Sequence, residues 1–122
     1  MRFTSLAILG LLIANPAFAG DPVGSYNVVG SIPGGGGDYR GTVTVTRTGG
    51  KADEFVTFRV VWVVAGDRIT GTAIGNDDFL AVTYRSGQET GLAVYGAVDQ
   101  NWGGYWTTAN GTQLGTEVWT RR

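Results

Sequence analysis

Apolar and polar residues alternate along most of this chain after residue 24, and the alternation predicts β-strands. β-branched and aromatic side chains occupy every second position in short runs, whereas apolar residues at helical spacing are nearly absent. We therefore predict eight strands, at residues 25–31, 39–48, 55–65, 68–74, 79–85, 91–97, 104–110 and 113–120.

The segments between these strands carry residues that favour tight turns. Runs rich in Gly, Asn and Asp lie at 34–38, 48–51, 65–67, 75–78, 86–88 and 110–111. Gly and Asn adopt positive φ at little cost, and Asn and Asp side chains cap turns. Asn110-Gly111 is typical of a two-residue type I′ hairpin, and Asn76-Asp77-Asp78 of a side-chain-capped turn. The chain is thus predicted to be a meander in which each strand pairs with the next.

The alternation also predicts which side chains face the core. The apolar stripes comprise Val43 and Val45, then Val56, Phe58, Val60, Trp62 and Val64, then Leu80, Val82 and Tyr84, and finally Leu92 and Val94. Hairpin-linked strands with one apolar face can hide their edges by closing on themselves. We predict an all-β fold, an antiparallel up-and-down meander of about eight strands closed into a small β-barrel. A two-sheet β-sandwich is the alternative.

The first nineteen residues have the features of a secretory signal peptide. Arg2 precedes an apolar run at residues 6–14, and Ala17-Phe18-Ala19 forms a small-residue cleavage site before Gly20. The apolar run is shorter than the roughly 20 residues that a membrane-spanning helix needs. We predict a signal peptide at 1–19 cleaved near Ala19, a single domain at 20–122, and a periplasmic or secreted location.

Composition and charge limit the number of domains and the kinds of partner that we expect. Cleavage after residue 19 would leave 103 of the 122 residues, enough for one domain, and the absence of cysteine excludes disulfides. The full chain has nine basic and ten acidic residues, so loss of Arg2 leaves a net charge of −2. Because there is no basic stripe to hold a phosphate backbone, we do not expect nucleic-acid binding.

The residue types present argue against an enzyme. The chain has no histidine and no cysteine, which removes imidazole bases, thiolate nucleophiles and the usual zinc ligands. Its one lysine, Lys51, falls in a predicted turn, where we expect it to be solvated. Asp77 and Asp78 are neighbours in a turn rather than carboxylates facing each other across a sugar, and a weak cation site is the alternative to turn formation there. We predict no catalytic residue, no metal and no cofactor.

Aromatic residues crowd the last strands and form the main candidate binding site. Because Tyr105 and Trp106 are adjacent on one strand, they must point to opposite faces, and one of them should lie outside the core. For Arg59 and Glu117, which lie in mid-strand among apolar neighbours, we expect outward, exposed positions, with mutual pairing as the alternative. The candidate binding residues are Tyr84, Tyr95, Trp102, Tyr105 and Trp119.

Several segments give the chain a family resemblance. They are Gly24-Ser25-Tyr26, the run from Tyr39 to Val45, the run from Phe79 to Arg85, the run from Gly91 to Tyr95, and the run from Gly115 to Thr120. With these segments the chain resembles small exported bacterial proteins, mostly of alphaproteobacteria, often labelled fibronectin-binding. The resemblance covers nearly the whole domain and implies export and a protein partner, without binding residues to carry over. The layout is more distantly similar to the eight-stranded barrels of avidins and lipocalins, but the lipocalin cysteines are absent and no biotin-binding set maps onto the chain.

Three functional hypotheses follow. The leading one is a non-enzymatic binding protein that contacts a macromolecular partner, fibronectin-like if the resemblance holds, through the aromatic residues named above. The alternative is a carrier of a small apolar ligand inside the barrel, with a lining of Phe58, Val60, Trp62, Leu80, Val82 and Tyr84, which requires a cavity of roughly 300 Å³ or more. A carboxylate-based hydrolase using Glu117 or Asp77 is the third.

Overall fold

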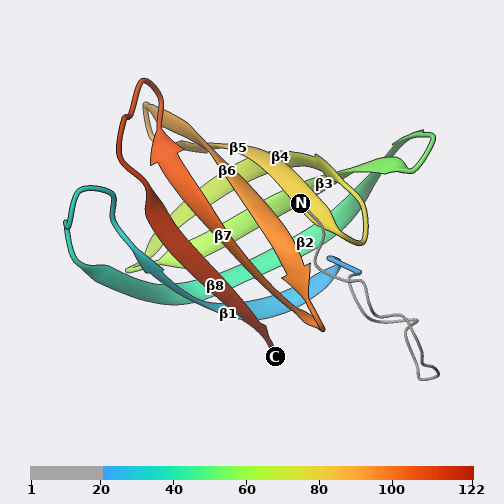
Figure 1. Ribbon diagram of the computed structural model, residues 1–122, viewed down its shortest axis with the longest axis horizontal. Coiled ribbons are helices and arrows are strands. Elements are labelled where there is room, and N and C mark those ends of the chain that lie inside the picture. Colours follow the sequence, from blue (N-terminus) through green and yellow to red (C-terminus); the bar gives the residue numbers. More distant parts are fainter. Residues whose placement is uncertain (1–20) are drawn as a thin grey trace.

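A computed structural model describes residues 21–122, so the predicted signal peptide and its cleavage site lie outside the described residues. The described chain consists of eight strands joined by turns and loops (Figure 1). The strands are β1 (Gly24–Ser31), β2 (Asp38–Ala52), β3 (Phe55–Val64), β4 (Asp67–Gly75), β5 (Phe79–Ser86), β6 (Glu89–Val98), β7 (Asn101–Thr108) and β8 (Gly115–Arg121).

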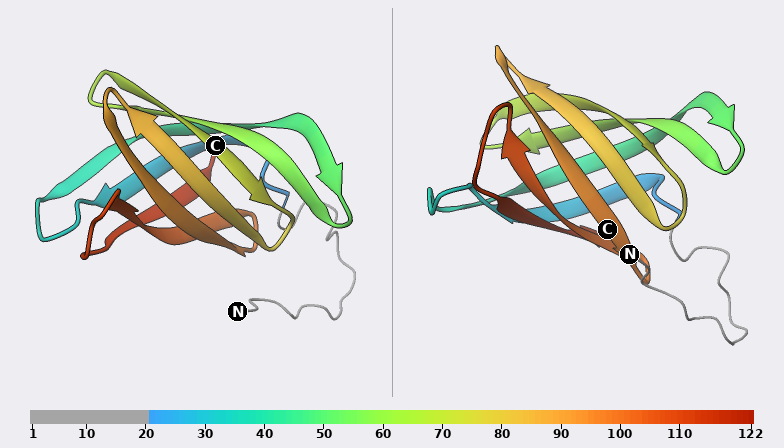
Figure 2. Two further views of the ribbon diagram at one scale, coloured as in Figure 1. Left: turned by 90° about the horizontal axis from the view of Figure 1, so that it is seen from above. Right: turned by 45° about the horizontal axis from the view of Figure 1, so that its top comes forward.

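The strands form a closed antiparallel barrel, as predicted. Each strand pairs with the next in sequence, and β1 pairs with β8 to complete the ring, with Val28 opposite Trp119 (Figures 1 and 2). The sandwich alternative is therefore excluded. Four connections, β1–β2, β3–β4, β5–β6 and β7–β8, lie at one end of the barrel, which we call the open end. The other three connections and the start of β1 lie at the opposite, packed end.

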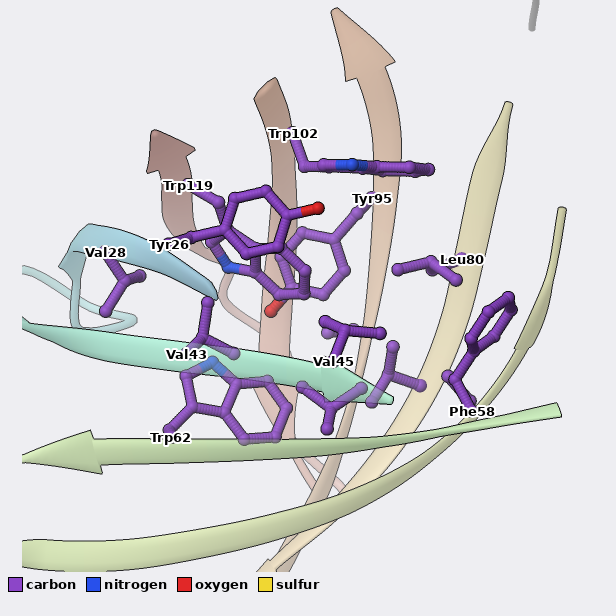
Figure 3. Close-up of a cluster of buried hydrophobic side chains, with 14 of the residues drawn as sticks. Tyr26, Val28, Val43, Val45, Phe58, Trp62, Leu80, Tyr95, Trp102 and Trp119 are labelled. Atoms are coloured by element: carbon purple, nitrogen blue, oxygen red, sulfur yellow. The ribbon is translucent and has the colours of Figure 1, made fainter. Parts of the chain in front are cut away.

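The barrel interior is filled largely by the stripes that the alternation predicts. Val43, Val45 and Leu80 are fully buried in one cluster (Figure 3). Val60 and Val82 belong to the same cluster. Aromatic side chains complete this core. The buried hydrophobic residues are Tyr26, Val28, Val43, Val45, Val56, Phe58, Val60, Trp62, Ala73, Leu80, Val82, Ala93, Tyr95, Trp102 and Trp119.

The prediction that Leu92 and Val94 of β6 face the core is wrong. Leu92 and Val94 are 50% and 48% exposed, whereas Ala93 and Tyr95 are buried. Directly opposed residues of an antiparallel pair share a face, and Tyr95 lies opposite the inward-facing Leu80. Gly91 belongs to the same inward series, because a Cβ at that position would collide with the hydroxyl of Tyr84.

Two turns also differ from the prediction. β2 continues through the expected turn at 48–51 with a register shift between Arg47 and Lys51, and the chain reverses after Ala52, where Asp53 has a φ of 56°. The resulting β2–β3 hairpin projects beyond the barrel (Figures 1 and 2). Asn110-Gly111 is not a two-residue hairpin, because β7 ends at Thr108 and β8 begins only at Gly115.

The capped turn at Asn76 is confirmed. The Asn76 side-chain oxygen accepts hydrogen bonds from the backbone amides of Asp78 (2.8 Å) and Phe79 (3.2 Å). Both bonds fix the chain reversal between β4 and β5, which is the ordinary role of such a side chain.

Arg121 closes the packed end of the barrel. Its guanidinium donates to the backbone carbonyls of Asp21 (2.7 Å) and Val23 (3.0 Å) and to the Tyr26 hydroxyl (2.9 Å), and it stacks on the Tyr26 ring at 4.7 Å. Trp102 is buried at the same end, since β7 begins there. These contacts tie β8 to the start of the described chain and fill the packed end with side chains.

Candidate functional site

A cavity of about 330 Å³ lies toward the open end of the barrel. Its walls are mainly aromatic and aliphatic, and its outer lining includes Ile32, Ala65 and Glu89, which are exposed at the strand ends. The lining residues are Ile32, Tyr39, Trp62, Val64, Ala65, Ile69, Tyr84, Ser86, Glu89, Ala93, Tyr95, Trp106 and Glu117. This is a concave, largely apolar space with few polar groups, as small-molecule sites usually are.

The carboxylate of Glu117 lies at the inner wall of the cavity and accepts four hydrogen bonds. Oε1 accepts from the indole N–H of Trp62 (3.1 Å), the hydroxyl of Tyr95 (2.8 Å) and the indole N–H of Trp119 (2.8 Å). Oε2 accepts from the hydroxyl of Tyr39 at 2.5 Å. Figure 3 shows Trp62, Tyr95 and Trp119 directed into the interior from their separate strands.

The predicted exposure of Glu117 is therefore wrong, whereas that of Arg59 is confirmed. Glu117 is only 6% exposed. The physical reason is its place on β8: Gly115, Glu117 and Trp119 form the inward series, and Trp119 is fully buried. A carboxylate can occupy such a position when its oxygens receive several donors, since these replace the hydrogen bonds of lost water.

The tyrosine hydroxyls of the site are held in their neutral form. Burial, reinforced by the nearby Glu117 carboxylate, raises the pKa of Tyr39 and raises that of Tyr95 well above the ordinary value. Burial, together with Glu89 and Glu117, raises the pKa of Tyr84 to about 12. These phenols thus remain donors at neutral pH, which the Glu117 network requires of Tyr39 and Tyr95.

Four rings follow one another around the cavity at steep angles. The ring centroids of Tyr39 and Trp106 are 6.2 Å apart at 70°, those of Trp106 and Tyr84 5.9 Å at 77°, and those of Tyr84 and Trp62 6.3 Å at 69°. Edge-to-face pairs of this kind are favourable because each ring has a negative face and a positive edge. Since adjacent rings are strongly inclined, the cavity is walled by aromatic surface on several sides.

The structure separates the five predicted binding residues. Tyr84 and Tyr95 line the cavity, Trp119 lies behind it as a donor to Glu117, and Trp102 is buried at the packed end. Only Tyr105 is exposed, at 54%, while its neighbour Trp106 faces inward as the adjacency argument predicts. The expectation that all five form one surface is therefore wrong, because four of the five belong to the interior.

The predicted cavity lining is partly correct. Trp62 and Tyr84 line the cavity, whereas Phe58, Val60, Leu80 and Val82 belong to the packed core.

Tyr39, Trp106 and Glu117 also line the cavity, although none of them was among the predicted lining residues. The signal for two of them was present, because Tyr39 shares the alternation of Val43 and Val45, and Glu117 that of Trp119.

Two indole N–H groups have no acceptor within residues 21–122. They belong to Trp102 and Trp106, and both nitrogens are buried. Trp106 is part of the cavity wall, so one polar group of the site lacks a partner.

Among residues 21–122, no group of three or more His, Cys, Asp or Glu side chains is arranged to hold a metal ion. The same residues include no helix that is long and apolar enough to cross a membrane.

Comparisons with known proteins bear on the fold alone. No family model matches the chain, and no curated protein matches it. Among solved structures, the chain is similar to a redesigned β-barrel, with a TM-score of 0.60 and 15% sequence identity over 83% of this chain and 91% of that one. Similarity at this level of identity supports the barrel architecture and carries no information on a ligand.

Proposed function

We propose that this protein is an exported, non-enzymatic carrier that binds a small, largely apolar molecule in the cavity at the open end of its barrel. The observation that carries the proposal is the 330 Å³ cavity walled by aromatic side chains. The interior of an eight-stranded barrel is either filled by side chains or holds one small ligand, and here the side chains leave a space at the open end. Its volume falls within the range of small-molecule sites, which begins at about 300 Å³.

The asymmetry of the barrel supports the same function. Arg121 and Trp102 close one end, whereas the lining of the cavity reaches exposed residues at the other. A ligand could therefore enter through the open end and be held against a rigid floor formed by Tyr95 and Glu117. Export is supported by the segment at 1–19, and the absence of histidine and cysteine favours carriage over catalysis.

The proposal is tested with a neutral apolar dye. N-phenyl-1-naphthylamine, which fluoresces more strongly in apolar surroundings, should bind the purified protein saturably at one site. Ala93→Phe places a ring in the cavity and should weaken binding at least about tenfold, or about 1.4 kcal/mol. Ala81→Phe makes the same change at an exposed position on the adjacent strand and should leave the affinity essentially unchanged.

Two results would contradict carriage in the cavity. One is the absence of saturable dye binding to the correctly folded protein. The other is equal affinity of the Ala93→Phe and Ala81→Phe variants, which would place the dye on the outer surface.

Recognition of a macromolecular partner is a second candidate function. It is favoured by a row of apolar side chains on the outer face, where Ile74, Ala81, Val94 and Tyr105 lie opposite one another across β4, β5, β6 and β7. Ile74, Val94 and Tyr105 are each about half exposed. The resemblance to exported proteins labelled fibronectin-binding supports a protein partner for this row.

A further inference from the structure

We infer that the ligand of the cavity is an organic cation, a substituted ammonium group with an apolar remainder. The inference rests on the proposed carrier function and adds the chemical class of the molecule carried. Three observations lead to it: the charges around the cavity, the bonding of Glu117, and the arrangement of the aromatic rings.

The charged groups of the cavity are all acidic. Its lining contains two carboxylates, those of Glu117 and Glu89, and no lysine or arginine. Glu117 lies at the inner wall and Glu89 is exposed at the mouth, so one carboxylate lies at each end of the cavity. Such a site repels anions and attracts cations, most strongly where water has been excluded.

The bonding of Glu117 leaves its charge without a counter-ion. Its four partners are neutral tyrosine and tryptophan groups, and all of them act as donors. An ionised carboxylate is acceptor-only and can use all four of these donors. Oε1 accepts three of these bonds and Oε2 accepts one, and none of the four donors carries a positive charge. Buried carboxylates are usually paired with a positive group, and within the described residues the cavity is where that group can be accommodated.

The rings provide the second half of the recognition. Tyr39, Trp62, Tyr84 and Trp106 surround the cavity with adjacent planes inclined by 69° to 77°. A cation over the face of a Trp or Tyr ring is attracted by the ring quadrupole, and several rings around one site bind substituted ammonium groups. The same rings accommodate the apolar remainder of the molecule. An aromatic enclosure with a carboxylate behind it therefore suits an alkyl- or arylammonium ion better than a neutral hydrocarbon.

The test compares two molecules of the same shape that differ in charge. Benzyltrimethylammonium and its neutral carbon analogue neopentylbenzene are titrated against the protein loaded with N-phenyl-1-naphthylamine, and tryptophan fluorescence is followed in parallel without dye. We expect the cation to bind at least about tenfold more tightly than its analogue, since a desolvated cation–π contact and a facing carboxylate both favour it.

Two variants locate the source of the preference. Glu117→Gln removes the charge with little change in size, and the ratio of the two affinities should fall toward one. Tyr84→Leu removes one aromatic face without removing a Glu117 donor and should lower the same ratio about threefold or more. Circular dichroism of each variant checks the fold, and the wild-type ratio stands as evidence even where Glu117→Gln fails to fold.

The outcomes separate this inference from the carrier function. If the dye binds in the cavity and both molecules displace it equally well, the carrier proposal stands and the cation inference is overturned. A preference for the cation that persists unchanged in folded Glu117→Gln and Tyr84→Leu would also overturn it. If neither dye nor either molecule changes the fluorescence, the carrier function itself fails.

Discussion

At the scale of single residues, the side chain of Glu117 is the centre of a hydrogen-bond network inside the barrel. Its two oxygens accept hydrogen bonds from residues on β2, β3, β6 and β8, and thus connect strands on different sides of the barrel. Removing the acceptor would leave four donors without a partner, and a buried unpaired group costs about 1–3 kcal/mol. Glu117 therefore serves stability as well as the proposed binding.

This double role predicts the effect of removing the acceptor. Glu117→Leu should lower the free energy of unfolding by about 3 kcal/mol or more, measured by urea denaturation. Arg59→Leu, at an exposed mid-strand position, is the control and should change it by no more than about 0.5 kcal/mol. Equal stability of the two variants would mean that the four hydrogen bonds contribute nothing net.

At the scale of strands, the outer face of the barrel is not uniform. On β2 the outward positions include Thr44 and Thr46, whereas β4 to β7 carry the apolar row from Ile74 to Tyr105. Both faces of β6 are apolar, with Leu92 and Val94 outside and Ala93 and Tyr95 inside. Exposed aromatic and aliphatic residues in one contiguous patch are typical of a contact surface.

If this row contacts a protein partner, its exposed ring should carry much of the binding energy. Tyr105→Ala should weaken binding to immobilised fibronectin at least about tenfold, because exposed aromatic residues are common hot spots. Thr44→Ala, exposed on β2, should bind like the wild type. The result is read from interferometry, and identical binding by both variants and the wild type would exclude the row as the contact site.

At the scale of the whole molecule, the two ends of the barrel differ in packing. The packed end holds Trp102 and Tyr26 and is tied to the start of the described chain by Arg121. The open end holds the cavity and its ring of tyrosines and tryptophans. A rigid floor and an accessible mouth are what a carrier requires, because the ligand enters a largely preformed site.

The buried tyrosines make the stability of the barrel dependent on pH. Burial and Glu117 raise the pKa of Tyr95 in the folded protein, whereas a tyrosine in the unfolded chain ionises near pH 10. The folded state therefore holds its proton more tightly, so its contribution is complete below about pH 10 and is lost as the pH rises above it. The free energy of unfolding should be level from pH 7 to 9 and fall above pH 10.

The size of that fall is checked with Tyr95→Phe, which lacks the ionising group. Above about pH 10 the wild type should lose up to about 1.4 kcal/mol per pH unit more than the variant, measured by urea denaturation at each pH. Parallel pH profiles for the two proteins would show that Tyr95 is not the group responsible.

The sequence determined the strands of this protein and their order, whereas the pairing of β1 with β8 decided between a closed barrel and a sandwich. Alternation with period two and turn residues at regular intervals are local properties, so eight strands in a meander follow from them, as does burial of Val43, Phe58 and Leu80. Alternation alone assigned the wrong face to β6, because both series of side chains there are apolar and only the pairing with β5 selects one.

Tertiary structure alone decided the site. Trp119 lies two residues from Glu117 on the same strand, but Tyr39, Trp62 and Tyr95 lie on β2, β3 and β6, and only the folded barrel brings their donors to this carboxylate. A lone acidic residue in a strand is usually exposed, and nothing local to Glu117 predicts the three donors that reach it from other strands. The cavity also depends on the tertiary structure. Side chains from both halves of the chain surround a space at the open end that they do not fill, and this space exists only when the barrel is closed.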